Sequence, residues 1–250
     1  MTGLEQVAVF VAGLAAGAIN AVVGSGTLIT FPVLLAVGFP PVVANVSNTV
    51  GLAPGSASAA YGYRRELAGQ AARLVRLGMA SLSGGITGAV LLLVLPDKAF
   101  KAIVPALIAL ACVLVVAQPA LVRRLRREEG IRRHGGPWLF AAVYGAGIYG
   151  GYFGAAQGVL LIAVLGLALA ENLQRINAAK NVLAGLVNMV AAVVFLFSAE
   201  IAWQPAILIA VASTAGGQIG ALVGRRLPPA VLRGFIVVVG IAAMVKLLTD

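Results

Sequence analysis

The sequence alternates between long apolar runs and short polar connections. Most runs are close to the roughly 20 residues that a helix needs to cross the hydrocarbon core of a bilayer. Two of them, at 27–37 and 159–169, hold only eleven residues, which at ~1.5 Å per residue span about half that core. We expect these two to be half-helices or re-entrant segments. The longer runs lie at residues 5–23, 42–62, 74–95, 101–121, 137–155, 177–197, 204–224 and 234–248.

Composition supports the same interpretation. Of the 250 residues, 61% are hydrophobic and 10% are charged, and the mean hydropathy is +1.02. These values are typical of polytopic membrane proteins. We therefore predict an all-α integral membrane protein with about eight transmembrane helices plus the short half-helices. The first run is expected to be a mature helix, because Met1–Gln6 has no basic residue and no small-residue cleavage site follows.

One apolar stretch, residues 19–56, is interrupted every few residues by glycine, proline, asparagine or serine. Irregular backbone at membrane depth is tolerated only when it is packed inside protein or lines a wet cavity. We interpret this stretch as part of a transport path. A counterpart follows about half a chain later.

The chain resembles itself at a spacing of 132 residues. This spacing predicts a first repeat at 1–122, a basic linker at 123–136 and a second repeat at 137–250. The alternative is that small residues recur only because they allow close helix packing. The matched positions include Gly13 with Gly145, Gly26 with Gly158, Asn45 with Asn177, and the SxxGGxxGA runs at 81–89 and 213–221.

Basic residues favour an inverted arrangement of the two repeats. If each repeat crosses the membrane an odd number of times, 15 of the 18 lysines and arginines share one side. Parallel repeats would give ten against eight. The positive-inside rule favours the inverted arrangement, with the basic loops in the cytoplasm. Inverted repeats are common in secondary transporters, whose substrate sites lie near the membrane midplane.

Polar residues follow one helix face inside the third run. Its candidate residues Asn45, Asn48 and Thr49, with Ser56 further along, have helical spacing. The 132-residue spacing maps this face onto the second half, so both halves would place polar groups at the same depth. The mapped positions are Asn177, Lys180, Asn181 and Asn188.

These side chains and two backbone breaks form the candidate substrate site. Amides and hydroxyls can orient an anion, and Lys180 adds a positive charge where charge is costly. Helix N-termini that begin at the breaks would present backbone N–H groups to the same anion. The breaks lie at Gly24, Ser25 and Gly26 and at Gln157 and Gly158, and Asn20, Ser56 and Asn188 are secondary candidates.

Structural roles for the same residues stay open. Asparagine and serine in membrane helices often bond a neighbouring helix. Lys180 is close enough to the polar connection at 171–175 for its side chain to snorkel to the membrane surface.

The residue types in the sequence give little support for a catalytic function. The chain has one histidine, His134, and one cysteine, Cys112, and every carboxylate lies near the end of an apolar run. We expect no catalytic residues, no metal site and no cofactor. The net charge of +10 is explained by topology signals, so no nucleic-acid partner is expected.

Two segments resemble the signatures of a known family. GLAAGAINAVVGSGTLITFPVLLAVGFPPVVANVSNTVG and GGYFGAAQGVLLIAVLGLALAENLQRINAAKNVLAGLVN are similar to the two signatures of the sulfite exporter TauE/SafE family, also called domain of unknown function 81. Ser25 and Ala156 depart from the family pattern, which leaves the anion open. The resemblance implies a membrane permease for sulfite or a related sulfur-containing anion.

Our leading hypothesis is a permease or exporter of the bacterial inner membrane that moves sulfite or an organosulfur anion by alternating access. Its expected partners are the small anion, the lipid bilayer and a coupling ion, either a proton or sodium. The sequence leaves the oligomeric state open. Two alternatives are a non-transporting membrane scaffold or assembly factor and a passive anion channel.

Overall fold

The computed structural model describes residues 1–127, 136–223, 234, 237–239, 241 and 244. Within these residues it contains nine helices and no strand. The helices follow the predicted apolar runs closely, and the two short runs are short helices. They are α1 (Gly3–Val22), α2 (Thr27–Ala36), α3 (Pro41–Gly62), α4 (Ala71–Val94), α5 (Asp97–Arg127), α6 (Pro137–Tyr152), α7 (Gln157–Ala168), α8 (Leu173–Ser198) and α9 (Trp203–Val223).

Five of the described helices, α1, α4, α5, α8 and α9, are long and apolar enough to cross a membrane. Helix α3 has sufficient length, 22 residues, but carries the polar face, and α6 has only 16 residues. The last predicted run, 234–248, lies mostly outside the described residues. The described helices agree with the predicted all-α, multi-pass membrane protein.

Helix α5 continues to Arg127. The predicted linker at 123–136 is therefore helical over its first five residues, because the apolar helix extends into the basic segment without a breaker. Residues 128–135 of the linker lie outside the described part of the chain.

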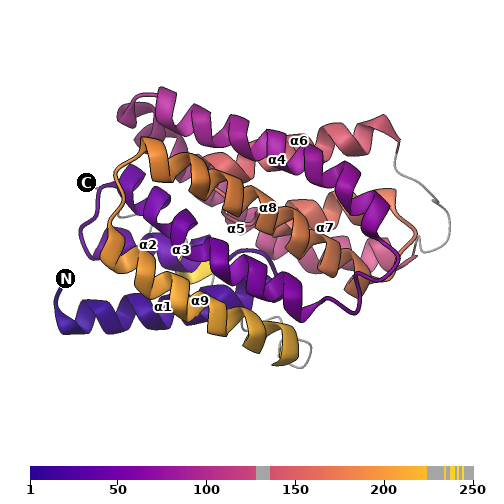
Figure 1. The fold of residues 1–250 in the computed structure, drawn as a ribbon, viewed down its shortest axis with the longest axis horizontal. Coiled ribbons are helices and arrows are strands. Elements are labelled where there is room, and N and C mark those ends of the chain that lie inside the picture. The colour runs from indigo at the N-terminus through magenta and orange to yellow at the C-terminus, as the bar shows by residue number, and fades with distance from the viewer. Residues whose placement is uncertain (128–135, 224–233, 235–236, 240, 242–243, 245–250) are drawn as a thin grey trace.

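Two helix pairs approach to backbone contact through glycine. Helix α1 packs on α9 and α6 packs on α4, along opposite edges of the bundle, with α3 and α8 between them (Figure 1). A Cβ added to Gly88 would overlap the carbonyl oxygen of Ile148, and one added to Gly220 would overlap that of Ala18. The small residues of the two SxxGGxxGA runs therefore allow these helices to approach to backbone contact.

Both of these pairs are parallel. The carbonyls of Leu14 and Ala18 lie against Gly216 and Gly220, so residue numbers rise together along α1 and α9. The carbonyls of Tyr144 and Ile148 lie against Gly84 and Gly88 in the same order along α6 and α4.

Helices α3 and α8 run in opposite directions. Near the middle of the pair, the Nδ2 of Asn188 donates a hydrogen bond of 2.8 Å to Ser56 Oγ. Further along α3, Ala59 and Tyr63 pack with Ala178, which is earlier in α8. Residue numbers thus rise along one helix as they fall along the other.

The connections α1–α2 and α6–α7 are built alike. The N–H of Gly24 donates to the Ile19 carbonyl at 3.1 Å, and that of Gly154 donates to the Tyr149 carbonyl at 3.0 Å. Both glycines have a positive φ, +85° and +78°, which ends the helix with little steric cost.

These matching bonds are 130 residues apart (154 − 24), not the 132 of the sequence comparison. Helix α7 has twelve residues whereas α2 has ten, so the spacing returns to 132 at the starts of α3 and α8. The sequence pairing of Gly26 with Gly158 is therefore shifted by two positions.

An ion-pair cluster joins the α3–α4 connection to the α7–α8 connection. Glu171 accepts a bond of 3.1 Å from Arg73 and one of 2.6 Å from Arg175. Arg175 also donates to the Ala68 carbonyl at 3.0 Å. These two connections therefore lie at the same end of the bundle.

The Glu171 cluster predicts an acid-sensitive part of the stability. Partial burial alone would raise the pKa of this carboxyl, but hydrogen bonds from Arg175 and Arg73 outweigh it and hold the pKa below its ordinary value of 4.5. The ion pairs therefore contribute fully above about pH 4.5 and are lost as the pH falls through the lower pKa of the folded state. Glu171→Gln should lower the thermal midpoint at neutral pH, and the gap to the native protein should close in acid.

Thermal unfolding in detergent between pH 3 and pH 7 measures this gap. Glu200→Gln, at an exposed position, is the matched control and should follow the native curve. A gap between Glu171→Gln and the native protein that is independent of pH would contradict the prediction.

Candidate functional site at the two helix breaks

The two predicted breaks lie against each other. The N–H of Gly158, in the first turn of α7, donates a bond of 3.1 Å to the carbonyl of Gly24, just past the end of α1. A Cβ on either glycine would overlap the Cα of the other. The start of the short helix in one half is thus in backbone contact with the break in the other half.

Side chains of α8 cap the C-terminal end of α1. Lys180 Nζ donates to the carbonyls of Asn20 at 2.8 Å and Ala21 at 3.2 Å. Asn177 and Asn181 also donate to Ala21, at 3.2 Å and 3.1 Å. The last carbonyls of a helix have no partner within it and carry the negative end of its dipole. A cation with two amide donors satisfies them.

The end of α6 is capped in a similar way by the other half. Asn45 Nδ2, on α3, donates a bond of 3.0 Å to the carbonyl of Tyr152, the last residue of α6. Each break is therefore closed by a long helix of the opposite half.

Lys180 connects the two breaks. Its side chain is fully buried, with 0% of its surface exposed, and its Cδ lies beside Gly158 while its ammonium reaches α1. The possibility that Lys180 snorkels to the surface is wrong, because carbonyl oxygens at the end of α1 supply its hydrogen bonds inside the protein.

Asn48 faces the short helix α2. It bonds the hydroxyl of Thr30, and its Nδ2 donates to Thr27 Oγ1 at 3.3 Å. Sequence reasoning missed these two threonines. Their i, i+3 spacing in an apolar segment is the signal that could have found them.

The remaining candidates are divided among several places. Thr49 Oγ1 donates within its own helix to the Asn45 carbonyl at 3.0 Å. Gln157 Nε2 donates to the Ala146 carbonyl of α6 at 3.2 Å. Ser56 and Asn188 bond each other, as described above, rather than the breaks. Asn20 Oδ1 accepts from the Gly26 N–H at 3.4 Å.

Three buried polar atoms of the candidate residues have no hydrogen-bond partner within the described part of the chain. They are Ser25 Oγ, Asn45 Oδ1 and Asn177 Oδ1. Buried polar groups without partners are rare, and each requires an explanation such as a water or a ligand. No three His, Cys, Asp or Glu side chains of the described residues gather as a metal site would need.

Comparison of the sequence with known proteins shows the family of the chain. A family model described as sulfite exporter TauE/SafE matches residues 9–247. The chain belongs to the sulfite exporter TauE/SafE family.

Curated relatives of this TauE/SafE chain carry transporter names. The probable membrane transporter protein ORF9 of Sinorhizobium sp is 26% identical, covering 96% of the chain and 91% of the relative. The probable membrane transporter protein YfcA of Escherichia coli strain K12 is 26% identical, covering 96% and 88%. A probable membrane transporter protein of Haemophilus influenzae is 25% identical, covering 99% and 96%. No solved structure matches the chain.

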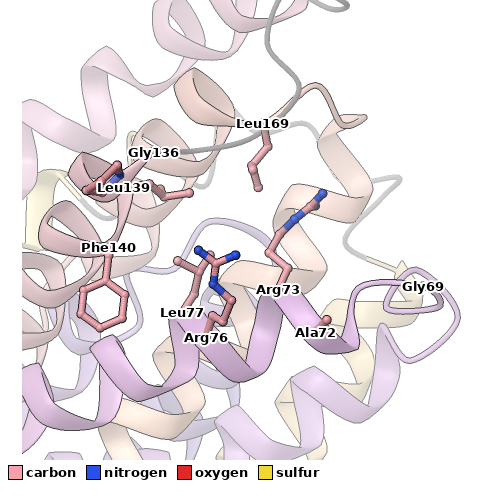
Figure 2. Close-up of a pocket in the computed structure, with 10 residues that line it drawn as sticks. Gly69, Ala72, Arg73, Arg76, Leu77, Gly136, Leu139, Phe140 and Leu169 are labelled. Carbon is pink, nitrogen blue, oxygen red and sulfur yellow. The ribbon is translucent and has the colours of Figure 1, made fainter.

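The breaks of this TauE/SafE family member are distinct from a cavity at the ends of its helices. That cavity lies between α4 and α6 (Figure 2), and none of the predicted site residues lines it. The candidate site is therefore defined by the helix breaks and their capping side chains.

Two glycine substitutions test the contact between the breaks. Gly24 and Gly38 both have a positive φ, but a Cβ on Gly38 meets nothing within 4 Å. Gly38→Ala should therefore cost only the backbone strain, roughly 1–2 kcal/mol. Gly24→Ala should cost roughly 1–3 kcal/mol more, because its Cβ overlaps Gly158.

Thermal or denaturant unfolding of both variants in the same detergent measures the difference. Equal losses of stability would contradict the contact between Gly24 and Gly158.

Proposed function

We propose that the chain is a multi-pass permease of the bacterial inner membrane that moves a small anion, sulfite or an organosulfur anion. Transport would occur by alternating access between two inverted halves, with the basic loops in the cytoplasm. The family and the names of the relatives support a membrane transporter; the substrate and the mechanism are our proposal.

Helix directions support the inverted arrangement. The corresponding helices α3 and α8 run in opposite directions, and Ser56 and Asn188, 132 residues apart, bond each other. An axis relating the halves would pass between these two side chains. The Glu171 cluster also holds together two connections that share a side only if the halves are inverted.

The observation that carries the proposal is the fully buried amino group of Lys180. Its hydrogen bonds go to carbonyl oxygens, and no described carboxylate pairs with it. Carbonyl dipoles only partly offset the cost of burying a full charge. When it is protonated, Lys180 is therefore an uncompensated cation at the two helix breaks, and it attracts an anion.

The surrounding groups complete an anion site. In the proposed step the anion replaces the Asn20 and Ala21 carbonyls as the partner of Lys180. The polar residues Asn45, Asn48, Thr49, Asn177 and Asn181 line the site. Backbone N–H groups of 24–26 and 157–158 would add donors at the starts of α2 and α7 once they leave their present partners, such as Asn20 Oδ1 for Gly26 and the Gly24 carbonyl for Gly158.

The unpaired acceptors suit a protonated oxyanion. Asn45 Oδ1 and Asn177 Oδ1 can each accept the hydroxyl of a monoprotonated anion such as hydrogensulfite, and Ser25 Oγ can donate. A fully deprotonated anion such as sulfate offers these two oxygens no donor.

Substitution of Lys180 tests the proposal. Lys180→Met keeps most of the side-chain volume and removes the amino group, so it should abolish the uptake of radiolabelled sulfite per unit of folded protein in proteoliposomes. Lys98→Met, at an exposed position, should transport like the native protein. Uptake by Lys180→Met at the native rate would remove Lys180 from the mechanism.

The same assay separates the related mechanisms. Accumulation against a gradient that is lost when a proton or sodium gradient is collapsed identifies the coupling ion. Flux that neither saturates nor accumulates would indicate a passive anion channel instead.

One observation favours a second function, a non-transporting membrane scaffold. The amide donors of Asn45, Asn177 and Asn181 are all used on helix ends, as residues that only hold helices together would be. A scaffold binds no solute at the breaks.

Asn45→Ala distinguishes the two functions. Loss of its bond to Tyr152 should cost roughly 1–3 kcal/mol in either case. The permease additionally predicts that sulfite raises the thermal midpoint of the native protein and that this rise shrinks in the variant. Equal midpoints with and without sulfite, sulfate, thiosulfate and sulfonates would favour the scaffold.

A further inference from the structure

A cavity of about 620 Å³ opens at one end of the bundle, between the first turns of α4 and α6 and the end of α7. Figure 2 shows the guanidinium groups of Arg73 and Arg76 rising from α4 toward the side of the cavity formed by Leu139 and Leu169. Leu77 and Phe140 complete the apolar wall. The cavity thus combines a basic side with an apolar side.

The two arginines differ in their partners. Arg73 is paired with Glu171 at 3.1 Å. Arg76 is exposed and has no hydrogen-bond or ion-pair partner among the described residues. Among the described residues, the cavity therefore carries one positive charge without a partner.

Its position corresponds to the membrane surface. Arg73 and Arg76 lie in the first two turns of α4, one of the candidate spans. Trp138, in the first turn of α6, is 48% exposed, and exposed tryptophan is typical of the boundary between lipid and water. A lipid headgroup and the upper part of its acyl chain occupy this depth.

We propose that this cavity binds one anionic phospholipid. The phosphate lies at Arg76, and the first part of an acyl chain lies against Leu77, Leu139 and Phe140. Basic pockets between membrane helices bind anionic headgroups in this way. A soluble phosphate would use only the arginine and would leave the apolar wall in contact with water.

Native mass spectrometry of the full-length, delipidated protein tests the proposal, with dioleoylphosphatidylglycerol as the probe. Dioleoylphosphatidylcholine tests the need for negative charge, and glycerol 1-phosphate tests the need for acyl chains. Arg76→Gln should weaken phosphatidylglycerol binding about fivefold, the effect of one basic residue near an anionic surface. Arg65→Gln, an exposed arginine outside the cavity, should bind like the native protein.

Ala72→Phe provides a variant without a charge change. Ala72 lines the cavity, so a phenyl ring there should fill the space and reduce phosphatidylglycerol binding as well. Because Ala72 and Arg76 are both exposed, neither variant should alter the lipid-free thermal midpoint by much.

Three results would overturn the proposal. The first is equal binding of phosphatidylglycerol and phosphatidylcholine. The second is native affinity in Arg76→Gln or in Ala72→Phe. The third is full displacement of the lipid by glycerol 1-phosphate, which would show a site for a small soluble anion.

Discussion

Two interrupted helices inside an apolar bundle leave backbone groups that only the protein can bond. Water is absent from the hydrocarbon core, so each unpaired carbonyl or N–H there costs several kcal/mol. This chain has two such breaks, one between α1 and α2 and one between α6 and α7, and the backbone groups at each need partners. The remainder of the structure can be understood as the way in which this need is met.

Polar side chains of α3 and α8 supply the hydrogen-bond donors at the two breaks. Asn45 closes the end of α6, while Lys180 with two asparagines closes the end of α1. Lys180 lies at the C-terminal end of α1, where two carbonyls accept bonds from α8, whereas only one carbonyl at the end of α6 accepts a bond from Asn45. The helix dipole is negative at this end of α1. The same donors that complete the fold are therefore the groups that an anion would compete for. The breaks are therefore both a contact that holds the two halves of the chain together and a candidate binding site.

Much of the fold could be predicted from the sequence, because hydrophobic length is a strong signal in membrane proteins. The two short helices followed from run length alone, and the breaks followed from Gly24 and its neighbours. The register was harder. A two-residue difference between α2 and α7 is invisible in apolar sequence, so the comparison at 132 residues shifted the breaks by two.

The hydrogen-bond partners of the polar side chains could not be predicted from the sequence either. Spacing placed Asn45, Asn177 and Lys180 on buried faces, and the structure agrees, since they are 1%, 6% and 0% exposed. Nothing in the spacing indicated that they would reach the carbonyls of a different half. The contacts of Asn48 with α2 and of Glu171 with Arg73 depend on tertiary packing in the same way.

The opposite orientation of the two halves is the claim on which this account rests. It can be measured by labelling single cysteines with a membrane-impermeant maleimide in intact cells, in a Cys112→Ser background. Arg65→Cys in the α3–α4 connection, Ala170→Cys in the α7–α8 connection and Glu200→Cys in the α8–α9 connection report the three exposed positions. The account predicts that position 200 is labelled in intact cells, whereas positions 65 and 170 are labelled only after the cells are permeabilised. Labelling of 65 and 200 from the same side, with 170 opposite, would contradict it.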